Sequence, residues 1–303
     1  MHSPEYLRSL SNINPELEEL LKTTSPGRRL DANTDVAELR QRLLETKKEQ
    51  SETAPPSPSE FTDPRTPPSG GSPVFVVYHG GGFCLGGLEN ETVLCRQWTE
   101  LGGVAVNVDY RLAPEHPFPT GINDAFDALK WTASHVDELK VDPSKGFLVG
   151  GISAGANFSS IVSHLYLDEK LSPPLTGVYL SIPPVNKDAP LLNREVAQIF
   201  DKYYAAREPS PLATPVLFPS HKDLPPTYFQ ICGLDPLRDE GFIYEDLLKE
   251  SGVETKTQVY PGLPHGFWSW FPEAEFSKKF VEDCKDGLSW LLGEVELRLR
   301  VEQ

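Results

Sequence analysis

The sequence contains few cysteines and no long apolar run, and both absences limit what the protein can be. Its four cysteines are scattered along the chain and form no CxxC pair: Cys84, Cys95, Cys232 and Cys284. Scattered cysteines are typical of free thiols in a reducing compartment rather than of a disulfide framework or a zinc site. Because no stretch of about 18 apolar residues occurs, we expect no helix that spans a membrane.

The start of the sequence also lacks the pattern of a secretory signal. The first twenty residues contain no basic stretch followed by an apolar block. Together with the free thiols, this pattern predicts a cytoplasmic protein.

Positive charge is scarce as well. Lys and Arg number 28 against 44 Asp and Glu, which gives a formal net charge of −16. A chain this acidic is not expected to bind nucleic acid or an anionic membrane. It should also repel anionic substrates, most strongly at low salt, so we expect a neutral small-molecule substrate. The 303 residues, of which 39% are hydrophobic, suffice for one or two domains with a buried core.

The N-terminal part of the chain is predicted to consist of a helical cap, residues 1–50, and a linker. Residues 15–24 and 35–48 carry apolar side chains at helical spacing, and Asn14 is a capping residue before the first of these helices. The two helices either pack on the body of the protein or cover an active site, and the pattern favours neither. Residues 51–73 contain seven prolines, too many for a central strand, and are predicted to form a linker.

The rest of the chain, residues 74–303, alternates between short apolar runs and helical stretches. Strands are predicted at 74–78, 104–108, 147–150, 178–182, 227–232 and 257–260. Helices are predicted between most of them, at 121–139, 153–167, 238–251 and 273–297. This alternation is typical of an α/β fold with a mostly parallel central sheet and helices on both faces. Such sheets bind ligands at the carboxyl ends of their strands, so the residues just past each strand are the candidates for function.

Four of the predicted strands are followed by residues that suit acyl-transfer chemistry. They are the three glycines Gly80–Gly82, Ser153 within a Gly-x-Ser-x-Gly motif, Asp235 and His265. The order Ser, Asp, His along the chain is that of the α/β-hydrolase arrangement. A serine hydroxyl needs an imidazole to accept its proton, and the imidazole needs a carboxylate to hold its tautomer.

Each of these motifs also has a plainer interpretation. Gly-x-Ser-x-Gly can be an ordinary tight turn, and a lone histidine is often a structural residue. The rarer run His79-Gly80-Gly81-Gly82 lets backbone N–H groups point into a cavity, where they can stabilise an oxyanion. It can also be a flexible loop, whereas a phosphate cradle is disfavoured because the Lys and Ser/Thr of a phosphate loop are missing.

Longer motifs carry a resemblance to a known family. They are HGGGF (79–83), DYRLAPEHPFP (109–119), GISAG (151–155), DPLRDEG (235–241) and PGLPHGF (261–267). In these motifs the chain resembles the hormone-sensitive-lipase-like family of α/β-hydrolases, a carboxylesterase branch, from residue 74 to about residue 295. HGGGFCLGG and HGFWSWFP resemble fungal members most, some of which act in secondary metabolism.

The resemblance implies a role for each candidate residue. Ser153 would be the nucleophile, His265 the general base and acid, and Asp235 the residue that orients the histidine. The oxyanion would be bound by backbone N–H groups, those of Gly81, Gly82 and Ala154. No metal or cofactor is implied. Candidates for lining the substrate pocket are Phe83, Trp268 and Trp270, although packing in the core explains the two tryptophans equally well.

Other residues compete with these candidates, and the expected competitors are all structural. His79 would brace the glycine loop, as its counterpart does in the family. His116, Asp109 and Glu115 would fix their own segment. The pair Asp239 and Glu240 would begin a helix, where acidic residues suit the macrodipole.

The chain departs from the family at three places. Residues 51–73 are too short and proline-rich for the strand pair that most members have there, so we expect the first strand pair to be reduced or absent. The segment 183–187 is shorter than in relatives, and residues 186–226 are expected to form a cap insertion. Ile152 replaces an Asp or Thr that is common before the serine.

The predicted function is hydrolysis of carboxylic esters of short to medium acyl chains through an acyl-enzyme, in the fungal case as a tailoring step of secondary metabolism. One alternative is a cyclase or acyl transferase on the same scaffold. Another is a ligand-binding receptor, which the presence of His265 disfavours. Ester, amide and lactone substrates are not distinguished, because all pass through a tetrahedral intermediate, and the oligomeric state is not predicted.

Overall fold

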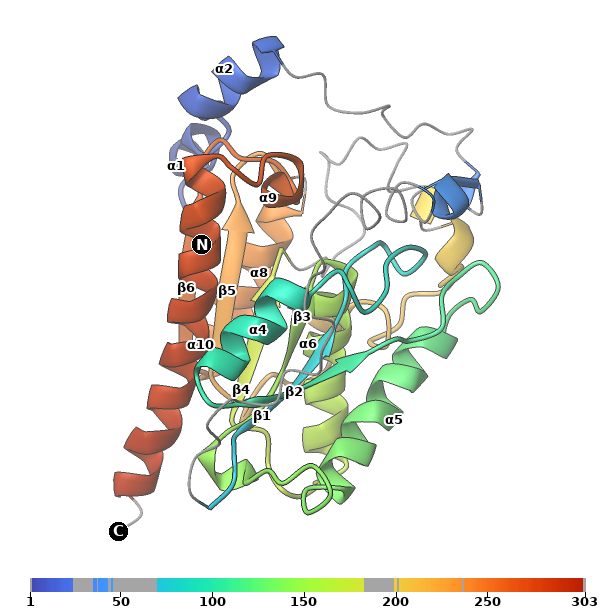
Figure 1. The fold of residues 1–303 in the computed structure, drawn as a ribbon, viewed down its shortest axis with the longest axis vertical. Helices are drawn as coiled ribbons and strands as arrows, with labels where there is room; N and C mark the ends of the chain where they lie inside the picture. The colour runs from blue at the N-terminus through green and yellow to red at the C-terminus, as the bar shows by residue number, and fades with distance from the viewer. Residues whose placement is uncertain are drawn as a thin grey trace.

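The apolar runs of the sequence form one six-stranded parallel sheet in the order β2-β1-β3-β4-β5-β6 (Figure 1). The strands are β1 Val74–Tyr78, β2 Val104–Val108, β3 Phe147–Ile152, β4 Gly177–Ser181, β5 Thr227–Cys232 and β6 Thr255–Tyr260. Strands β1, β3, β4 and β5 are buried almost throughout, which is why they read as continuous apolar runs rather than as alternating patterns.

This structure is a computed structural model. It describes residues 2–23, 35–36, 38–42, 45, 70–182, 199–200, 202–235 and 237–301, the last eight by their backbone alone. The predicted linker over 51–73 therefore falls mostly outside the described residues, and so does the expected loss of the first strand pair. The short segment 183–187 lies outside them entirely.

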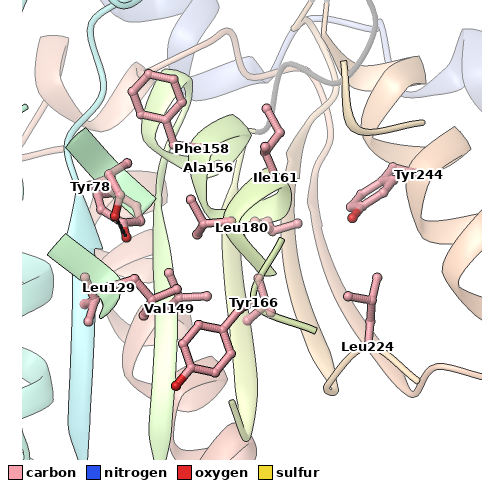
Figure 2. Packing of buried hydrophobic residues seen from close by; sticks show 14 of the residues in the cluster. Tyr78, Leu129, Val149, Ala156, Phe158, Ile161, Tyr166, Leu180, Leu224 and Tyr244 are labelled. Carbon is pink, nitrogen blue, oxygen red and sulfur yellow. Dashed lines mark hydrogen bonds between the residues drawn. The ribbon is translucent and has the colours of Figure 1, made fainter. Parts of the chain in front are cut away.

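Helices cover both faces of the sheet, as the alternating pattern predicted. They are α4 Thr92–Glu100, α5 Thr120–Ser134, α6 Ala154–Asp168, α8 Arg238–Glu250, α9 Phe267–Trp270 and α10 Glu275–Val301. Successive side chains along a strand point to opposite faces, so each strand contributes to two cores. Val149 enters one core together with Ile161 of α6, as Figure 2 shows, whereas Leu148 enters the other with Leu288 of α10.

Two helices near the N-terminus precede the sheet, α1 Pro4–Ser9 and α2 Pro15–Thr23. The predicted cap of α2 is confirmed, because Asn14 Oδ1 accepts hydrogen bonds from the N–H groups of Glu16 and Leu17 at 2.9 and 3.2 Å. Helix α1 was not predicted, although Ser3 caps it in the same way by accepting from Tyr6 N–H. Of the predicted helix over 35–48, the described residues 36, 38–42 and 45 are helical.

Some element boundaries differ from the predictions. The helix predicted over 121–139 ends at Ser134, where the chain turns before residue 141. Helix α4 was not predicted. In the part of the chain that the structure describes, no helix combines the length and the apolar character needed to cross a membrane.

Candidate active site

The carboxyl ends of the parallel strands bring the candidate residues to one edge of the sheet. Ser153 follows β3, Asp235 follows β5 and His265 follows β6, while the glycine loop follows β1 beside β3. Since all six strands run in the same direction, residues far apart in sequence meet at this edge.

Ser153 stands at a sharp turn between β3 and α6. Its backbone has φ +54° and ψ −117°, an unusual conformation for a residue with a side chain, and its N–H donates to Ser181 O at 2.8 Å. The glycines on either side are required by space, because a Cβ at Gly151 or Gly155 would overlap the carbonyl oxygen of Tyr78. The turn is therefore a strained strand-to-helix turn, the geometry that a nucleophilic serine requires, rather than an ordinary tight turn.

Ser153, His265 and Asp235 form one hydrogen-bonded chain. His265 Nδ1 lies 2.7 Å from Asp235 Oδ2, and His265 Nε2 lies 3.0 Å from Ser153 Oγ. Because a carboxylate accepts hydrogen bonds, the proton of the neutral ring belongs on Nδ1, which leaves Nε2 to accept from the serine hydroxyl. The Asp235 side chain is 1% exposed and that of His265 is 30% exposed, so the chain runs from the interior toward solvent.

The glycine loop lies directly beside the serine. An added Cβ at Gly80 would come 3.6 Å from the Cβ of Ser153. Among the residues that the structure describes, none accepts a hydrogen bond from the N–H of Gly81, Gly82 or Ala154. Backbone donors next to a nucleophile that have no protein acceptor are the arrangement that an oxyanion requires.

Three side chains hold the backbone of His79 and Gly80. The Tyr110 hydroxyl donates to His79 O at 2.7 Å, and its ring stacks on the His79 ring with centroids 4.2 Å apart. His79 Nδ1 lies 2.8 Å from Gly80 O, and Gly80 N–H donates to Glu91 Oε1 at 2.8 Å. His79 thus braces the loop, as the resemblance implied.

Burial raises the pKa of two of these groups. It raises the pKa of Tyr110 well above its usual value, so the hydroxyl keeps the proton that it donates. Glu91 is 4% exposed, and burial raises the pKa of its carboxyl to about 7, although the hydrogen bond from Gly80 opposes that shift.

A second group of contacts holds the far side of the glycine loop. Arg40 donates to Cys84 O at 3.1 and 2.8 Å and to Ala113 O at 2.8 Å. Val36 and Ile199 are buried together with Cys84 and Ala113. Described residues from both predicted cap segments therefore meet beside the loop.

The three pocket candidates lie in different surroundings. Phe83 stacks on Tyr204, with ring centroids 4.0 Å apart. Trp268 is partly buried and stacks on Phe280 at 3.7 Å. Trp270 is 56% exposed. None of these contacts tests a role in substrate binding, which stays a prediction for all three.

The competing polar residues lie apart from the triad's hydrogen bonds. His116 is exposed, Glu115 forms an ion pair with Arg40 at 2.8 Å, and Asp109 is exposed within 4.0 Å of His79 Nε2. Asp239 and Glu240 lie in the first turn of α8, as predicted.

Sequence reasoning missed two buried charged residues near the site, Glu91 and Arg238. Glu91 lies in an acidic stretch that looks like ordinary surface, so no sequence signal distinguished it. Arg238 stands inside the DPLRDEG motif, which marked its position but not its contacts.

The chain is similar to proteins of one family along most of its length. A family described as alpha/beta hydrolase fold matches residues 75–269. An AB hydrolase superfamily protein of Schizosaccharomyces pombe is 38% identical over 94% of this chain and 96% of its own. Versiconal hemiacetal acetate esterase of Dothistroma septosporum is 36% identical over 74% of this chain and 75% of its own. Among solved structures, vibralactone cyclase has a TM-score of 0.81 at 31% identity, over 95% of this chain and 97% of the other.

Proposed function

The chain belongs to the alpha/beta hydrolase family, and from this premise we propose that it is a serine hydrolase that cleaves carboxylic esters. The observation that carries the proposal is the hydrogen-bonded chain from Ser153 through His265 to Asp235. The relative that is named an acetate esterase supports the same reaction.

In the first half of the reaction, Ser153 Oγ attacks the ester carbonyl while His265 Nε2 accepts the hydroxyl proton. Asp235 Oδ2 stabilises the resulting imidazolium through the 2.7 Å contact to Nδ1. The negative charge that develops on the carbonyl oxygen is bound by the N–H groups of Gly81, Gly82 and Ala154. His265 then donates its proton to the leaving alkoxide, and the acyl group remains on Ser153.

Water completes the reaction by the same steps in reverse order. His265 removes a proton from water, the hydroxide attacks the acyl-enzyme, and the same backbone donors bind the second tetrahedral intermediate. Ser153 recovers its proton from His265 as the acid leaves. Apart from the ester and water, these reaction steps use only groups of the protein chain.

Replacing the nucleophile tests the proposal. Ser153→Ala removes the attacking oxygen, so we expect kcat for p-nitrophenyl butyrate to fall by about 10⁶-fold if chemistry limits the rate. Purified wild type and variant are compared by release of p-nitrophenol, and circular dichroism verifies that both are folded. A variant that keeps most of the wild-type esterase activity would refute the assignment.

The substrate class is proposed to be neutral esters with short to medium acyl chains. The net charge of −16 supports a neutral substrate, since anions are repelled. We further propose a tailoring step in fungal secondary metabolism, on the strength of the Dothistroma relative. Rates with p-nitrophenyl acetate, butyrate, octanoate and palmitate give the chain-length preference, and a maximum at palmitate would contradict the proposal.

A second candidate is intramolecular acyl transfer, in which a hydroxyl of the substrate replaces water. The similarity to vibralactone cyclase favours this candidate. Mass spectrometry separates the two reactions, because a hydrolysed product contains an added water and a cyclised product does not. Reaction in ¹⁸O-labelled water with no label in the product would favour cyclisation.

We also propose a domain division and a compartment. Residues 1–50 and 186–226 are proposed to form a cap over the catalytic domain 74–303, joined by the linker 51–73. The burial of Val36 and Ile199 in one apolar cluster supports this division. A cytoplasmic location is supported by the four free cysteines, because cysteines without disulfides are typical of a reducing compartment.

A further inference from the structure

The chain between α1 and α2 lies against the two loops that carry Asp235 and His265. Gly262, three residues before His265, donates its N–H to Leu10 O at 2.8 Å and accepts from Asn14 N–H at 3.1 Å. Figure 1 shows α1 and α2 (blue) at the end of the molecule where β5 finishes, beside α9. The N-terminal segment is thus hydrogen-bonded on both sides of one residue in the histidine loop.

Arg238 ties the same segment to the loop of Asp235. Its Nη1 lies within hydrogen-bond distance of three oxygens, at 2.8 Å from Leu7 O, 2.9 Å from Ser11 Oγ and 3.1 Å from Gly233 O. Its Nε donates to Asp239 Oδ1 at 2.6 Å, and the whole residue is 7% exposed. A buried guanidinium with this many acceptors has one orientation, so it holds the pieces of chain around it rigidly.

The segment and the loops are in backbone contact, with no room for a side chain between them. A Cβ at Gly233 would overlap Leu10 O, and a Cβ at Gly262 would overlap Asn12 O and come against Asn14 N. The two loops are also joined to each other, since Leu234 N–H donates to Leu263 O at 3.0 Å.

We propose that residues Leu7–Asn14, here called the N-terminal brace, are a positioning element for catalysis, and that Arg238 is the positioning residue that anchors them. The brace sets the spacing between the loops of Asp235 and His265, and through it the 2.7 Å contact between those side chains. The inference rests on the proposed hydrolase function. Because reacting groups tolerate little displacement, an error of about 1 Å at His265 costs about 10²-fold in rate.

A pair of glycine variants tests the brace. Gly262→Ala forces Leu7–Asn14 away from the histidine loop. Gly252→Ala is the matched control, since Gly252 has a similar φ of +82° against +71° but no atom within 4 Å of an added Cβ. Both variants therefore carry the same left-handed backbone penalty, and only one displaces the brace.

We expect kcat to fall while KM stays nearly constant, with both measured well below the melting temperature of each variant. Gly262→Ala should lose about 10²-fold in kcat and in the rate of fluorophosphonate labelling of Ser153, with KM within about twofold of wild type. Gly252→Ala should keep both rates. The downfield proton resonance of the His265–Asp235 hydrogen bond should weaken in the first variant and persist in the second. Equal kcat and labelling rates in the two variants would overturn the proposal.

Arg238 provides a second test in case Gly262→Ala does not fold. Arg238→Ala should lower kcat by a similar factor, and millimolar guanidinium, which is too dilute to denature the protein, should restore part of the loss. Arg238→Lys, which keeps the charge but not the planar donor fork, should fall between wild type and Arg238→Ala. Wild-type activity in folded Arg238→Ala would overturn the anchoring role. Failure of the hydrolase proposal would look different, since wild type itself would then show no Ser153-dependent turnover.

Discussion

The buried carboxyl of Glu91 is the least expected residue of the site. A carboxyl placed in a nearly dry environment holds its proton more tightly than one in water, and its pKa rises accordingly to about 7. In this position the carboxyl accepts a hydrogen bond from the N–H of Gly80, which has no other acceptor among the described residues. Glu91 therefore fixes the peptide just before the first proposed oxyanion donor, and burial of its carboxylate costs stability at neutral pH, although the hydrogen bond from Gly80 offsets part of that cost.

The free energy of unfolding should show this cost as a dependence on pH. The folded pKa of Glu91 lies above its usual 4.5, so the folded protein binds the proton more tightly than the unfolded chain does. The associated stability is fully present below pH 4.5 and is lost as the pH rises through about 7. Gln is neutral at every pH and keeps an acceptor for Gly80, so the stability of Glu91→Gln relative to wild type should rise by about 3 kcal/mol from pH 4.5 to pH 8.

Chemical denaturation of the two proteins at several pH values measures this difference. Because other titrating groups are common to both proteins, their effects cancel in the comparison. Glu250→Gln, which replaces an exposed carboxyl at the end of α8, serves as the control. A pH-independent difference for Glu91→Gln would mean that the carboxyl has the same pKa in the folded protein as in the unfolded chain.

At the scale of elements, the turn from β3 into α6 places Ser153 beside the glycine loop and His265. Helix α6 is buried along nearly its whole length and starts so close to β1 that only glycine fits at its second residue. The close approach brings the helix N-terminus, with its unpaired N–H groups, to the glycine loop after β1. Packing and catalysis thus depend on the same contact.

Gly155→Ala should therefore cost both stability and activity. Its Cβ would overlap the Tyr78 carbonyl oxygen, so α6 or β1 must shift, and we expect a loss of about 3 kcal/mol or more together with most of the esterase activity. Gly293→Ala is the control, because Gly293 also lies in a helix but has no atom within 4 Å of an added Cβ. There alanine should stabilise α10 by up to about 1 kcal/mol. Thermal denaturation measures the stability of both variants, and turnover of p-nitrophenyl butyrate measures their activity. Equal effects of the two substitutions would contradict the packing argument.

At the scale of the whole molecule, the net charge of −16 acts on charged substrates before they reach the site. A negatively charged protein lowers the local concentration of anions around it, and salt screens this repulsion over about 10 Å at 0.1 M. The net charge affects how often a charged ester reaches the site, and it does not determine which bound ester is cleaved.

Ionic strength should therefore separate anionic from neutral substrates. Raising the salt from about 10 mM to about 500 mM should increase kcat/KM severalfold for a p-nitrophenyl ester with a carboxylate on its acyl chain. The matched neutral ester of equal length should change little, which makes it the control for general salt effects on the enzyme. An equal response of the two esters would mean that the site is shielded from the charge of the rest of the protein.

Particular residues show how far sequence reasoning reached. Strands such as 74–78 and 227–232 were predicted to the residue, because a strand that is buried on both faces must be apolar along its whole length. Helix α4 was not predicted, because no capping motif marks its start. Its N-cap residue is Glu91, whose side chain forms no capping hydrogen bond. Helix α5 ends five residues earlier than predicted, at Ser134 instead of 139, because apolar spacing continues through the turns that follow it.

The parallel sheet and the order of Ser153, Asp235 and His265 follow from the amino-acid sequence alone, because apolar periodicity and local glycine requirements act over a few residues. Two features are visible only once the chain is folded. Glu91 faces the glycine loop, and residues Leu7–Asn14 lie against loops more than 200 positions away. Such contacts depend on how whole elements pack, and a surface glutamate or a short polar segment looks the same in sequence whether it is exposed or buried.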